Sequence, residues 1–179
     1  MAQGSLGYMT IEGADGEIRG ASLVVDYRGV PMDFRYTDPI RPTRLERILY
    51  GNALDVYLRE ELILQSLLNA VEARPSLWIC GDMDLLAPLR TTGKVRAAYL
   101  THSAHAPLDA IGHTESAGET GAVLLQADAI SAPLRVVFPS EIRQDEMNGA
   151  VNILIEAAQS MELMEPFGRI QKALASLTE

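Results

Sequence analysis

The stretch ALDVYLREELILQSLLNAVEA, residues 53–73, is the longest helical pattern in the chain and organises the rest of the fold. With residues placed at 100° each, one face of this helix is apolar, and Glu60 falls at its centre. A buried charge without a partner is costly, so Glu60 must be paired, protonated, metal-bound or close to water. We expect a buried ion pair with Arg41 or Arg47. The flanking apolar side chains are Val56, Tyr57, Ile63, Leu64, Leu67, Leu68 and Val71.

The order of the other segments predicts an α+β fold. Before the long helix we expect strands at 6–11, 21–27 and 30–37 and a short helix at 44–50. After it we expect strands at 76–80, 95–101, 121–126 and 134–138, then helices from Ser140 and over 166–177. Helices do not regularly separate the strands, so we predict one domain over 1–179, with a mixed or antiparallel sheet, one long central helix and two C-terminal helices packed on it. The polar, Gly-rich segment 103–120 is predicted to be a flexible loop.

The hairpin around Arg28-Gly29 has two possible registers. With a two-residue turn, Leu23 opposes Phe34, the apolar side chains share one face, and Asp26 lies on the polar face. If Asp26 instead opens a type I turn with Gly29 in a left-handed bulge, Asp26 opposes Val30 and turns toward the apolar face. We favour the first register because it segregates the two faces, but both stay open.

Composition limits the classes of function. The chain has 179 residues, 47% of them hydrophobic, and a net charge of −9, which disfavours nonspecific binding to phosphate backbones. We expect the arginines at 35, 41, 44 and 47 to pair with acidic residues, with a local phosphate-binding patch as the alternative. The single cysteine, Cys80, lies among apolar residues, excludes an internal disulfide and suits a reducing compartment. Without a signal sequence or a membrane-spanning run, the protein is predicted to be cytoplasmic, with no membrane contact.

One pattern indicates hydrolytic chemistry. A hairpin, a helix carrying an inward Glu, and a strand that ends in Asp follow the element order of the ribonuclease H-like fold, which this chain resembles in that respect. Members of that fold use carboxylates from these elements to hold two divalent metals. The matching positions here are Asp26, Glu60 and Asp82, with Asp84 as a possible fourth. Carboxylates suit Mg²⁺ or Mn²⁺, and the resemblance implies a metal-dependent nuclease acting on nucleic acid.

The three histidines form a second candidate site. His102, His105 and His113 lie within twelve positions of one another, and imidazole is a common transition-metal ligand. The surrounding segment is rich in Ala and Gly and fits no tight zinc motif. We therefore expect a solvated loop, with a metal site as the alternative.

The terminal helix offers an interaction surface. Phe167, Ile170, Leu174 and Leu177 form a narrow apolar stripe, which either covers the sheet or docks a partner. Separately, LVVDYRGVPMDFRYTDP at 23–39, together with Leu49-Tyr50-Gly51 and residues 57–61, resembles a pattern in uncharacterised bacterial proteins to which no activity is attached.

These observations lead to two functional hypotheses. Because no complete catalytic constellation survives the favoured hairpin register, the first is a non-catalytic, cytosolic interaction or assembly subunit of a bacterial protein complex. It would need no cofactor and would bind a protein partner or a second copy. The alternative is the ribonuclease H-like nuclease, with Asp26, Glu60 and Asp82 around Mg²⁺ or Mn²⁺.

Overall fold

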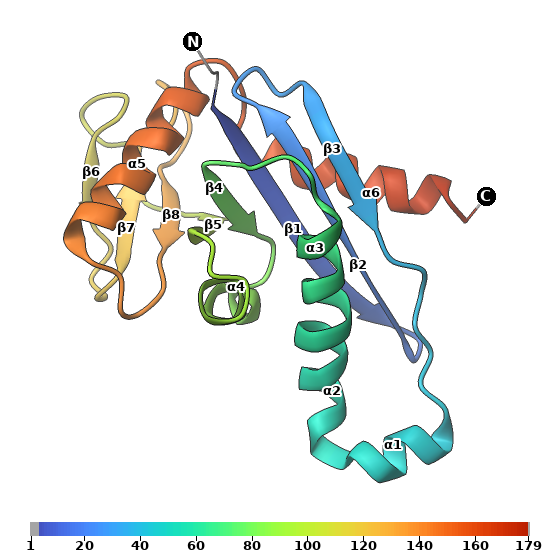
Figure 1. Ribbon diagram of the computed structural model, residues 1–179. Helices are drawn as coiled ribbons and strands as arrows, with labels where there is room; N and C mark the ends of the chain where they lie inside the picture. Colours follow the sequence, from blue (N-terminus) through green and yellow to red (C-terminus); the bar gives the residue numbers. More distant parts are fainter. Residues whose placement is uncertain (1–3, 179) are drawn as a thin grey trace.

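A computed structural model describes residues 4–178 (Figure 1). Eight strands form one mixed sheet in the order β3-β2-β1-β4-β5-β8-β7-β6. The strands are β1 (Ser5–Ala14), β2 (Glu17–Asp26), β3 (Pro31–Tyr36), β4 (Leu77–Cys80), β5 (Ala97–His102), β6 (Thr114–Ser116), β7 (Ala122–Leu125) and β8 (Leu134–Val137). The helices are α1 (Arg44–Tyr50), α2 (Leu54–Val56), α3 (Gln65–Ala70), α4 (Leu86–Thr91), α5 (Gln144–Ala158) and α6 (Glu165–Ser176). Strand β1 pairs antiparallel with β2 and parallel with β4, and β4 pairs parallel with β5.

The two N-terminal hairpins differ in their turns. Asp15 and Gly16 both have positive φ angles, of 55° and 80°, as a two-residue turn with matching twist requires. The second hairpin combines the two registers that the sequence allowed. Leu23 opposes Phe34 in the body of the strands, but the register shifts next to Val25, so that the Asp26 N–H donates to Val30 O at 2.9 Å. A β-bulge separates the two registers. The strands follow the register with Leu23 opposite Phe34, and the residues next to the turn follow the register with Asp26 opposite Val30.

The long helix is not a regular α-helix. Between α2 and α3, residues Tyr57–Leu64 form a π-helical segment, whose wider turn brings residues five apart onto one face. Leu58 and Ile63 are both buried at this spacing, whereas Val56, expected on the inner face, is 54% exposed. The predicted inner face of the helix, which assumed 100° per residue, was therefore wrong at Val56. Each residue of the π-helical segment turns the chain by a smaller angle than a residue of an α-helix does.

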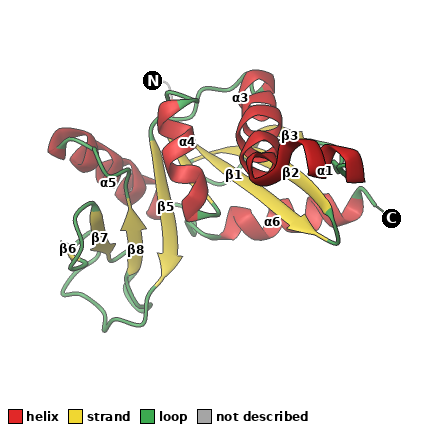
Figure 2. Cartoon of the chain, turned by 90° about the horizontal axis from the view of Figure 1, so that it is seen from below, coloured by secondary structure: helices red, strands yellow, loops and turns green. Residues whose placement is uncertain are grey.

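Helices cover both faces of the sheet (Figure 2). Helices α5 and α6 pack on one face, around a core that includes Leu6, Tyr8, Leu23, Leu154, Ile170 and Leu174. The long helix and α4 pack on the other, around Met9, Ile11, Val24, Leu58, Ile63, Leu67, Trp78, Cys80 and Leu89. The helix approaches β2 closely at Gly20, where an added Cβ would collide with Ile63 and stand 3.1 Å from Leu67. Gly20 therefore fixes how close the π-helical segment lies to the sheet.

The predicted fold class is confirmed: a single-domain α+β protein with a mixed sheet. Helix α5 begins at Gln144, after an N-cap at Arg143, and not near Ser140 as expected. Strand β6 lies inside the segment predicted as a loop, 103–120, and forms one end of the sheet. Among residues 4–178, no helix has both the length and the apolar character needed to span a bilayer.

Candidate functional site

The carboxyl ends of three adjacent parallel strands meet at one edge of the sheet. Strands β1, β4 and β5 run in the same direction, so the residues after Met9, Cys80 and Tyr99 lie side by side. Ligands of sheets with parallel strands bind outside these carboxyl ends. Asp82 follows β4, and His102 is the last residue of β5, so both belong to this carboxyl edge.

Asp82 links the end of β4 to the long helix. One of its carboxylate oxygens accepts a hydrogen bond from Arg59 at 2.9 Å, and the other accepts from the Asp84 N–H at 2.9 Å. The second bond caps the short helical turn that starts at Met83, while the Asp84 side chain itself is exposed. Both oxygens of Asp82 are therefore already engaged in holding this loop and the neighbouring helix.

Glu60 follows Arg59 in the π-helical segment and is half-buried. It forms no ion pair or side-chain hydrogen bond within residues 4–178. The ion pair expected with Arg41 or Arg47 is wrong. Arg41 pairs with Glu17 at 2.7 Å, and Arg47 donates to Gly16 O at 3.0 Å. The chain bends at Gly51, whose φ of 55° and ψ of −133° end α1, and the two arginines are directed toward the β1–β2 turn. Glu60 is thus half-buried without a side-chain partner among the described residues.

Asp26 lies at the opposite end of the sheet from Glu60 and Asp82. It is paired with Ser5 at the start of β1, whereas Cys80 is paired with Met9, four residues or about 13 Å further along. Its carboxylate accepts hydrogen bonds from the N–H groups of Arg28 and Val30 at 2.8 and 3.0 Å. The Arg28 side chain, followed by these two backbone donors, lowers the pKa of Asp26 despite its desolvation. The structure brings Asp82 to the Glu60 helix but does not bring Asp26 to either.

The carboxyl edge does not fit the two-metal centre that the resemblance implied. Side chains alternate along a strand, so Met9 and Cys80, not carboxylates, point from adjacent strands toward the long helix, and both are fully buried. Burial raises the pKa of the Cys80 thiol to about 12, which keeps it protonated and unsuited to a metal. Mg²⁺ requires hard oxygen ligands. No three His, Cys, Asp or Glu side chains gather as a metal cluster within residues 4–178.

The histidine segment does not assemble a metal site in the described part of the chain. His102 ends β5, His105 bonds to Ala106 O through Nδ1 at 2.8 Å, and His113 lies 3.6 Å from Glu115. The loops are held together by Gln126, which is buried, accepts from the Leu108 N–H and donates to two backbone carbonyls. The three histidines are thus separated, and the predicted metal site at His102, His105 and His113 is not formed.

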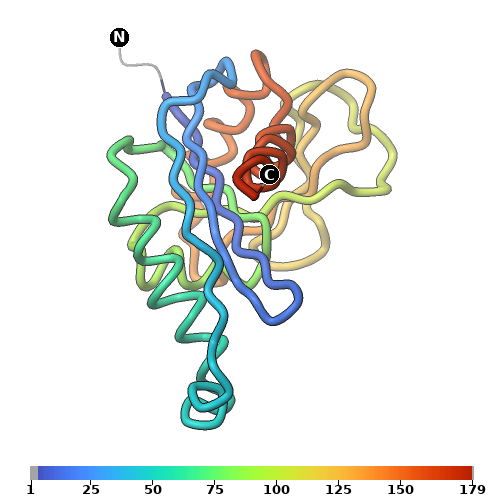
Figure 3. Tube along the Cα trace, turned by 90° about the vertical axis from the view of Figure 1, so that its right-hand side faces the viewer, coloured from blue at the N-terminus to red at the C-terminus, as the bar shows by residue number. Residues whose placement is uncertain are grey.

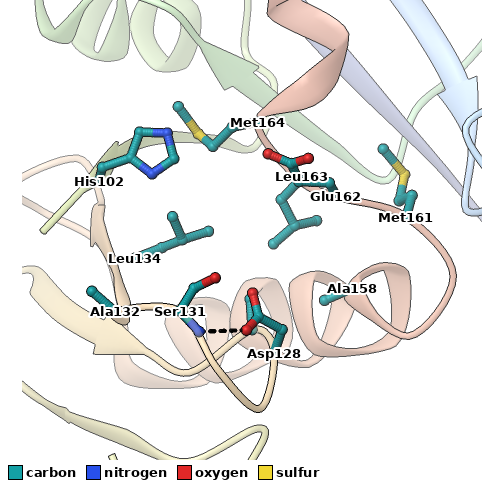
Figure 4. A pocket seen from close by; sticks show the side chains of 11 residues that line it. His102, Asp128, Ser131, Ala132, Leu134, Ala158, Met161, Glu162, Leu163 and Met164 are labelled. Atoms are coloured by element: carbon teal, nitrogen blue, oxygen red, sulfur yellow. Dashed lines mark hydrogen bonds between the residues drawn. The ribbon is translucent and has the colours of Figure 1, made fainter. Parts of the chain in front are cut away.

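Two pockets lie on the α6 side of the carboxyl edge and share His102 and Met164. One, of about 410 Å³, extends over Thr10, Glu12, Asp82 and Phe167. The other, of about 440 Å³, is shown in Figure 4 between the end of α5 and the loop 127–133. There Asp128 accepts from the Ser131 N–H at 2.7 Å, which closes the loop beside the pocket.

Sequence reasoning missed a group of exposed apolar side chains on a projecting arm formed by residues 41–50, at the foot of Figures 1 and 3. Helix α1 is well capped, by reciprocal bonds between Thr43 and Glu46, yet it buries none of its residues. Leu45, Ile48 and Leu49 are 63%, 67% and 72% exposed. Their spacing in the sequence follows one helix face and was available as a signal.

A groove of about 670 Å³ runs from the arm toward the long helix. Arg47, Asn52 and Arg59 line it, together with the β1–β2 turn at Gly16. Tyr50, at the end of the arm, stacks on Tyr57 with ring centroids 4.9 Å apart. The groove therefore connects the arm to Arg59, the residue beside Glu60.

The terminal stripe predicted for interaction lies against the sheet. Ile170 and Leu174 are fully buried, and Phe167 meets Tyr8 edge-on at 5.0 Å. Tyr8 also donates to Leu163 O at 2.6 Å, and burial raises its pKa. Leu177 is the one exposed member of the four. The stripe thus fastens α6 to β1 and β2.

Comparisons with known proteins concern the fold. The sequence matches no protein-family profile and no curated protein. Solved structures similar to this chain include endonuclease V from Streptomyces avermitilis, with a TM-score of 0.62 and 14% identity over 99% of this chain and 84% of that one. Endonuclease V from Bacillus subtilis gives 0.60 and 12%, over 98% and 83%. The catalytic domain of human endonuclease V gives 0.52 and 12%, over 97% and 85%. At such identities the likeness establishes a nuclease-like fold.

This likeness corrects the leading functional hypothesis. The prediction of a non-catalytic assembly subunit, defined by protein–protein interaction, is wrong, because the fold is shared over almost the whole chain with nucleases. The hypothesis took the lack of a complete set of carboxylates as a sign against catalysis, and the terminal stripe that it offered as an interaction surface is largely buried against the sheet. The chain thus shares its fold with these endonucleases V, and Met9 and Cys80 occupy the buried positions at its own carboxyl edge.

Proposed function

We propose that this protein acts on nucleic acid, which it binds through the projecting arm, residues 41–50, and the adjoining groove. The observation that carries the proposal is the set of three large apolar side chains, Leu45, Ile48 and Leu49, exposed on a capped helix that buries none of its residues. Exposed apolar side chains of this kind mark interaction sites.

Two features of the arm favour nucleic acid over other partners. Arg44 and Arg47 lie on the same helix as the apolar side chains, and Arg41 precedes it, so three cations suited to phosphate lie in the arm, two of them at the β1–β2 turn where Arg41 pairs with Glu17 and Arg47 donates to Gly16 O. Proteins that deform nucleic acid insert Leu or Ile between bases and hold the backbone with arginines. The groove then continues past Arg47 to Arg59, so a bound strand can follow it to the carboxyl edge. The endonucleases V that share this fold support the same partner class.

The net charge of −9 sets the expected strength of binding. Because the protein as a whole repels phosphate, affinity must come from the few local arginines and from apolar insertion. Each neutralised phosphate on duplex DNA contributes a salt slope of about −0.9, so three arginines give a slope of about −2 to −3. We therefore expect modest affinity with a shallow dependence on salt.

The binding test uses fluorescence anisotropy with single-stranded and duplex oligonucleotides of DNA and of RNA. The variant Ile48→Ser/Leu49→Ser is expected to weaken binding at least tenfold. The matched control is Ile130→Ser, which removes an 88% exposed isoleucine from the loop 127–133 and is expected to change nothing. Absence of binding by the unaltered protein, or an equal loss in both variants, contradicts the proposal.

Cleavage of the bound strand is a second candidate function, and Glu60 favours it. This carboxylate is half-buried, follows Arg59, which lines the groove, and has no side-chain partner within residues 4–178. Single π-helical segments within helices are frequent at functional sites. Since the residues do not form a two-metal centre, any role for Mg²⁺ or Mn²⁺ depends on a cation that enters with the phosphates of the strand, as Mg²⁺ often does.

The cleavage test incubates the same oligonucleotides with Mg²⁺, with Mn²⁺ and with EDTA, and resolves the products by gel electrophoresis. Glu60→Gln is expected to abolish product formation. Asp26→Asn is expected to retain it, because Asp26 lies at the other end of β1. If no product forms under any condition while binding persists, cleavage is excluded and the binding proposal stands.

A further inference from the structure

A pocket of about 420 Å³ lies at the other end of the parallel strands, where β4 and β5 begin. It is enclosed by the ends of α3 and α4 and by the segments that lead into the two strands. Helices α3 and α4 lie side by side over this part of the sheet in Figure 2. The pocket is on the face covered by the long helix, but at the opposite end of β4 from Asp82. It therefore belongs neither to the carboxyl edge nor to the groove beside the arm.

Two glycines shape the apolar part of the pocket. The ring of Trp78, which is 4% exposed, lies against the backbone of Gly7, where an added Cβ would stand 2.6 Å from it. Gly93 brings the segment after α4 close to the long helix, since a Cβ there would stand 2.7 Å from Leu68. Such close approach of a backbone requires glycine. The floor and one wall are thus fixed by packing within the protein itself.

The rim of the pocket at residues 71–75 is also anchored. Asp33, on β3, accepts hydrogen bonds from the N–H groups of Glu72 and Ala73 at 2.8 and 3.2 Å. The Asp33 side chain is 6% exposed, so this anchor is buried. Arg74 therefore extends from a segment that is already held, which lowers the entropy cost of ordering the site around a ligand.

The polar side chains at the rim can all donate hydrogen bonds. They are Gln65, Asn69, Arg74 and Thr92, and the first three are exposed and form no ion pair or side-chain hydrogen bond in the described part of the chain. No Asp or Glu of residues 4–178 lines this pocket, although the sequence has 24 acidic residues. An arginine without a counter-ion, beside an apolar floor, is complementary to an anion with an apolar body.

The helix ends beside the pocket weaken this complementarity only in part. The carboxyl end of a helix carries partial negative charge, and both α3 and α4 end here. The N–H groups of Thr92 and Gly93 both donate to Pro88 O, at 2.9 and 3.1 Å, and so offset the charge at the end of α4. Arg74 is left as the one formal charge among the described residues that line the pocket.

We propose that this pocket binds a small organic monocarboxylate, whose carboxylate pairs with Arg74 and whose apolar body lies against Trp78, Leu68 and Val95. A planar guanidinium can donate two parallel hydrogen bonds to a carboxylate. One guanidinium balances one negative charge, whereas a phosphate monoester brings nearly two into a protein whose net charge is already −9. The charge match therefore favours a carboxylate over a phosphate.

Trp78 is the one tryptophan of the sequence, so its fluorescence reports directly on the floor of the pocket. Titration with hexanoate at pH 7 is expected to give a saturable change. The matched probe 1-hexanol has the same apolar chain without the charge and is expected to bind about tenfold more weakly, because hydrogen bonds between charged groups are the stronger ones.

Arg74→Gln is expected to reduce the affinity for hexanoate to that for hexanol. The matched control is Arg96→Gln, which removes an exposed cation from the same edge of the sheet. Side chains alternate along a strand, and Ala97 packs on the long-helix face, so Arg96 points to the other face. This control is expected to bind hexanoate like the unaltered protein. Circular dichroism checks that both variants fold.

Three results overturn the site: no saturable change with hexanoate, equal affinity for hexanoate and hexanol, or an equal loss in Arg74→Gln and Arg96→Gln. The last result assigns the effect to overall charge and not to the pocket. Hexyl phosphate is the remaining probe, and tighter binding of it than of hexanoate overturns the assignment to a carboxylate.

Discussion

Asp26 and Glu60, which the sequence grouped as possible partners in one site, have opposite environments at the two ends of the sheet. Asp26 is held by two backbone N–H groups and by the Arg28 side chain, and it closes the β2–β3 turn. Glu60 has no such partner in the described chain and sits in a distorted helix beside the groove. One carboxylate is thus committed to the fold, whereas the other is left free to contact a ligand.

This difference teaches that carboxylates in one nuclease-like fold can have different roles, one in a turn and one free of protein partners. The scaffold still places a Glu on the helix and an Asp after β4, at the edge where parallel strands end. The buried positions between them are Met9 and Cys80, which complete the core and offer no hard ligand. Fold and site are therefore separate properties, and function must be argued from the side chains.

The largest expected effect comes from forcing the helix away from the sheet at the Glu60 end. Gly20→Val places side-chain atoms where Ile63 and Leu67 now lie, so the π-helical segment must shift. Overpacking of this kind costs about 1–3 kcal/mol. Urea unfolding monitored by circular dichroism measures the change. Gly13→Val, in the same hairpin, meets only Glu17 O at 3.5 Å and is the control expected to be nearly neutral.

A smaller effect distinguishes the two carboxylates directly. Asp26→Asn is expected to lower the free energy of unfolding at neutral pH, because the turn loses a charged acceptor, whereas Glu60→Gln is expected to change it by less than about 0.5 kcal/mol. Unfolding of both variants and of the unaltered protein by urea at pH 7 measures the difference. Equal losses in the two variants contradict the comparison.

The pH dependence sharpens the same prediction. The pKa of Asp26 is lowered from 3.8 in the folded state, chiefly by Arg28. Its contribution to stability is therefore fully present above pH 3.8 and is lost as the pH falls through the lower, folded value. The gap between the unaltered protein and Asp26→Asn is expected to be constant near neutrality and to close in acid.

Much of the fold followed from sequence periodicity. Residues 76–80 and 134–138 read as buried strands because they are short apolar runs, and the structure confirms β4 and β8 there. The π-helical segment was out of reach, because the helical projection assumed 100° per residue throughout. The hairpin was foreseen in two registers, and the bulge at Val25 shows that each holds in a different part of it.

Less of the site was predictable. Asp82 was correctly placed after a strand, but the neighbours of Glu60 depend on which residues of β1 and β4 lie side by side. The sequence predicted β1 only over 6–11, and it does not give the register in which β1 pairs with β4. In the structure, that register places Met9 beside Cys80. The spacing of Leu45, Ile48 and Leu49 along one helix face was a signal that the sequence analysis did not use. A sequence alone does not say that nothing packs against that face.

The smallest expected effect concerns the tether between Asp82 and Arg59. Their side chains are 41% and 20% exposed, so the ion pair is partly screened by water and is expected to contribute about 0.2–1 kcal/mol. A double-mutant cycle with Arg59→Gln and Asp82→Asn isolates this coupling from the bond that Asp82 accepts from Asp84. A coupling in this range means that a phosphate can compete for Arg59 at little cost. A coupling of several kcal/mol instead makes the pair a fixed part of the fold, like Asp26 and its turn, and removes Arg59 from the proposed binding groove.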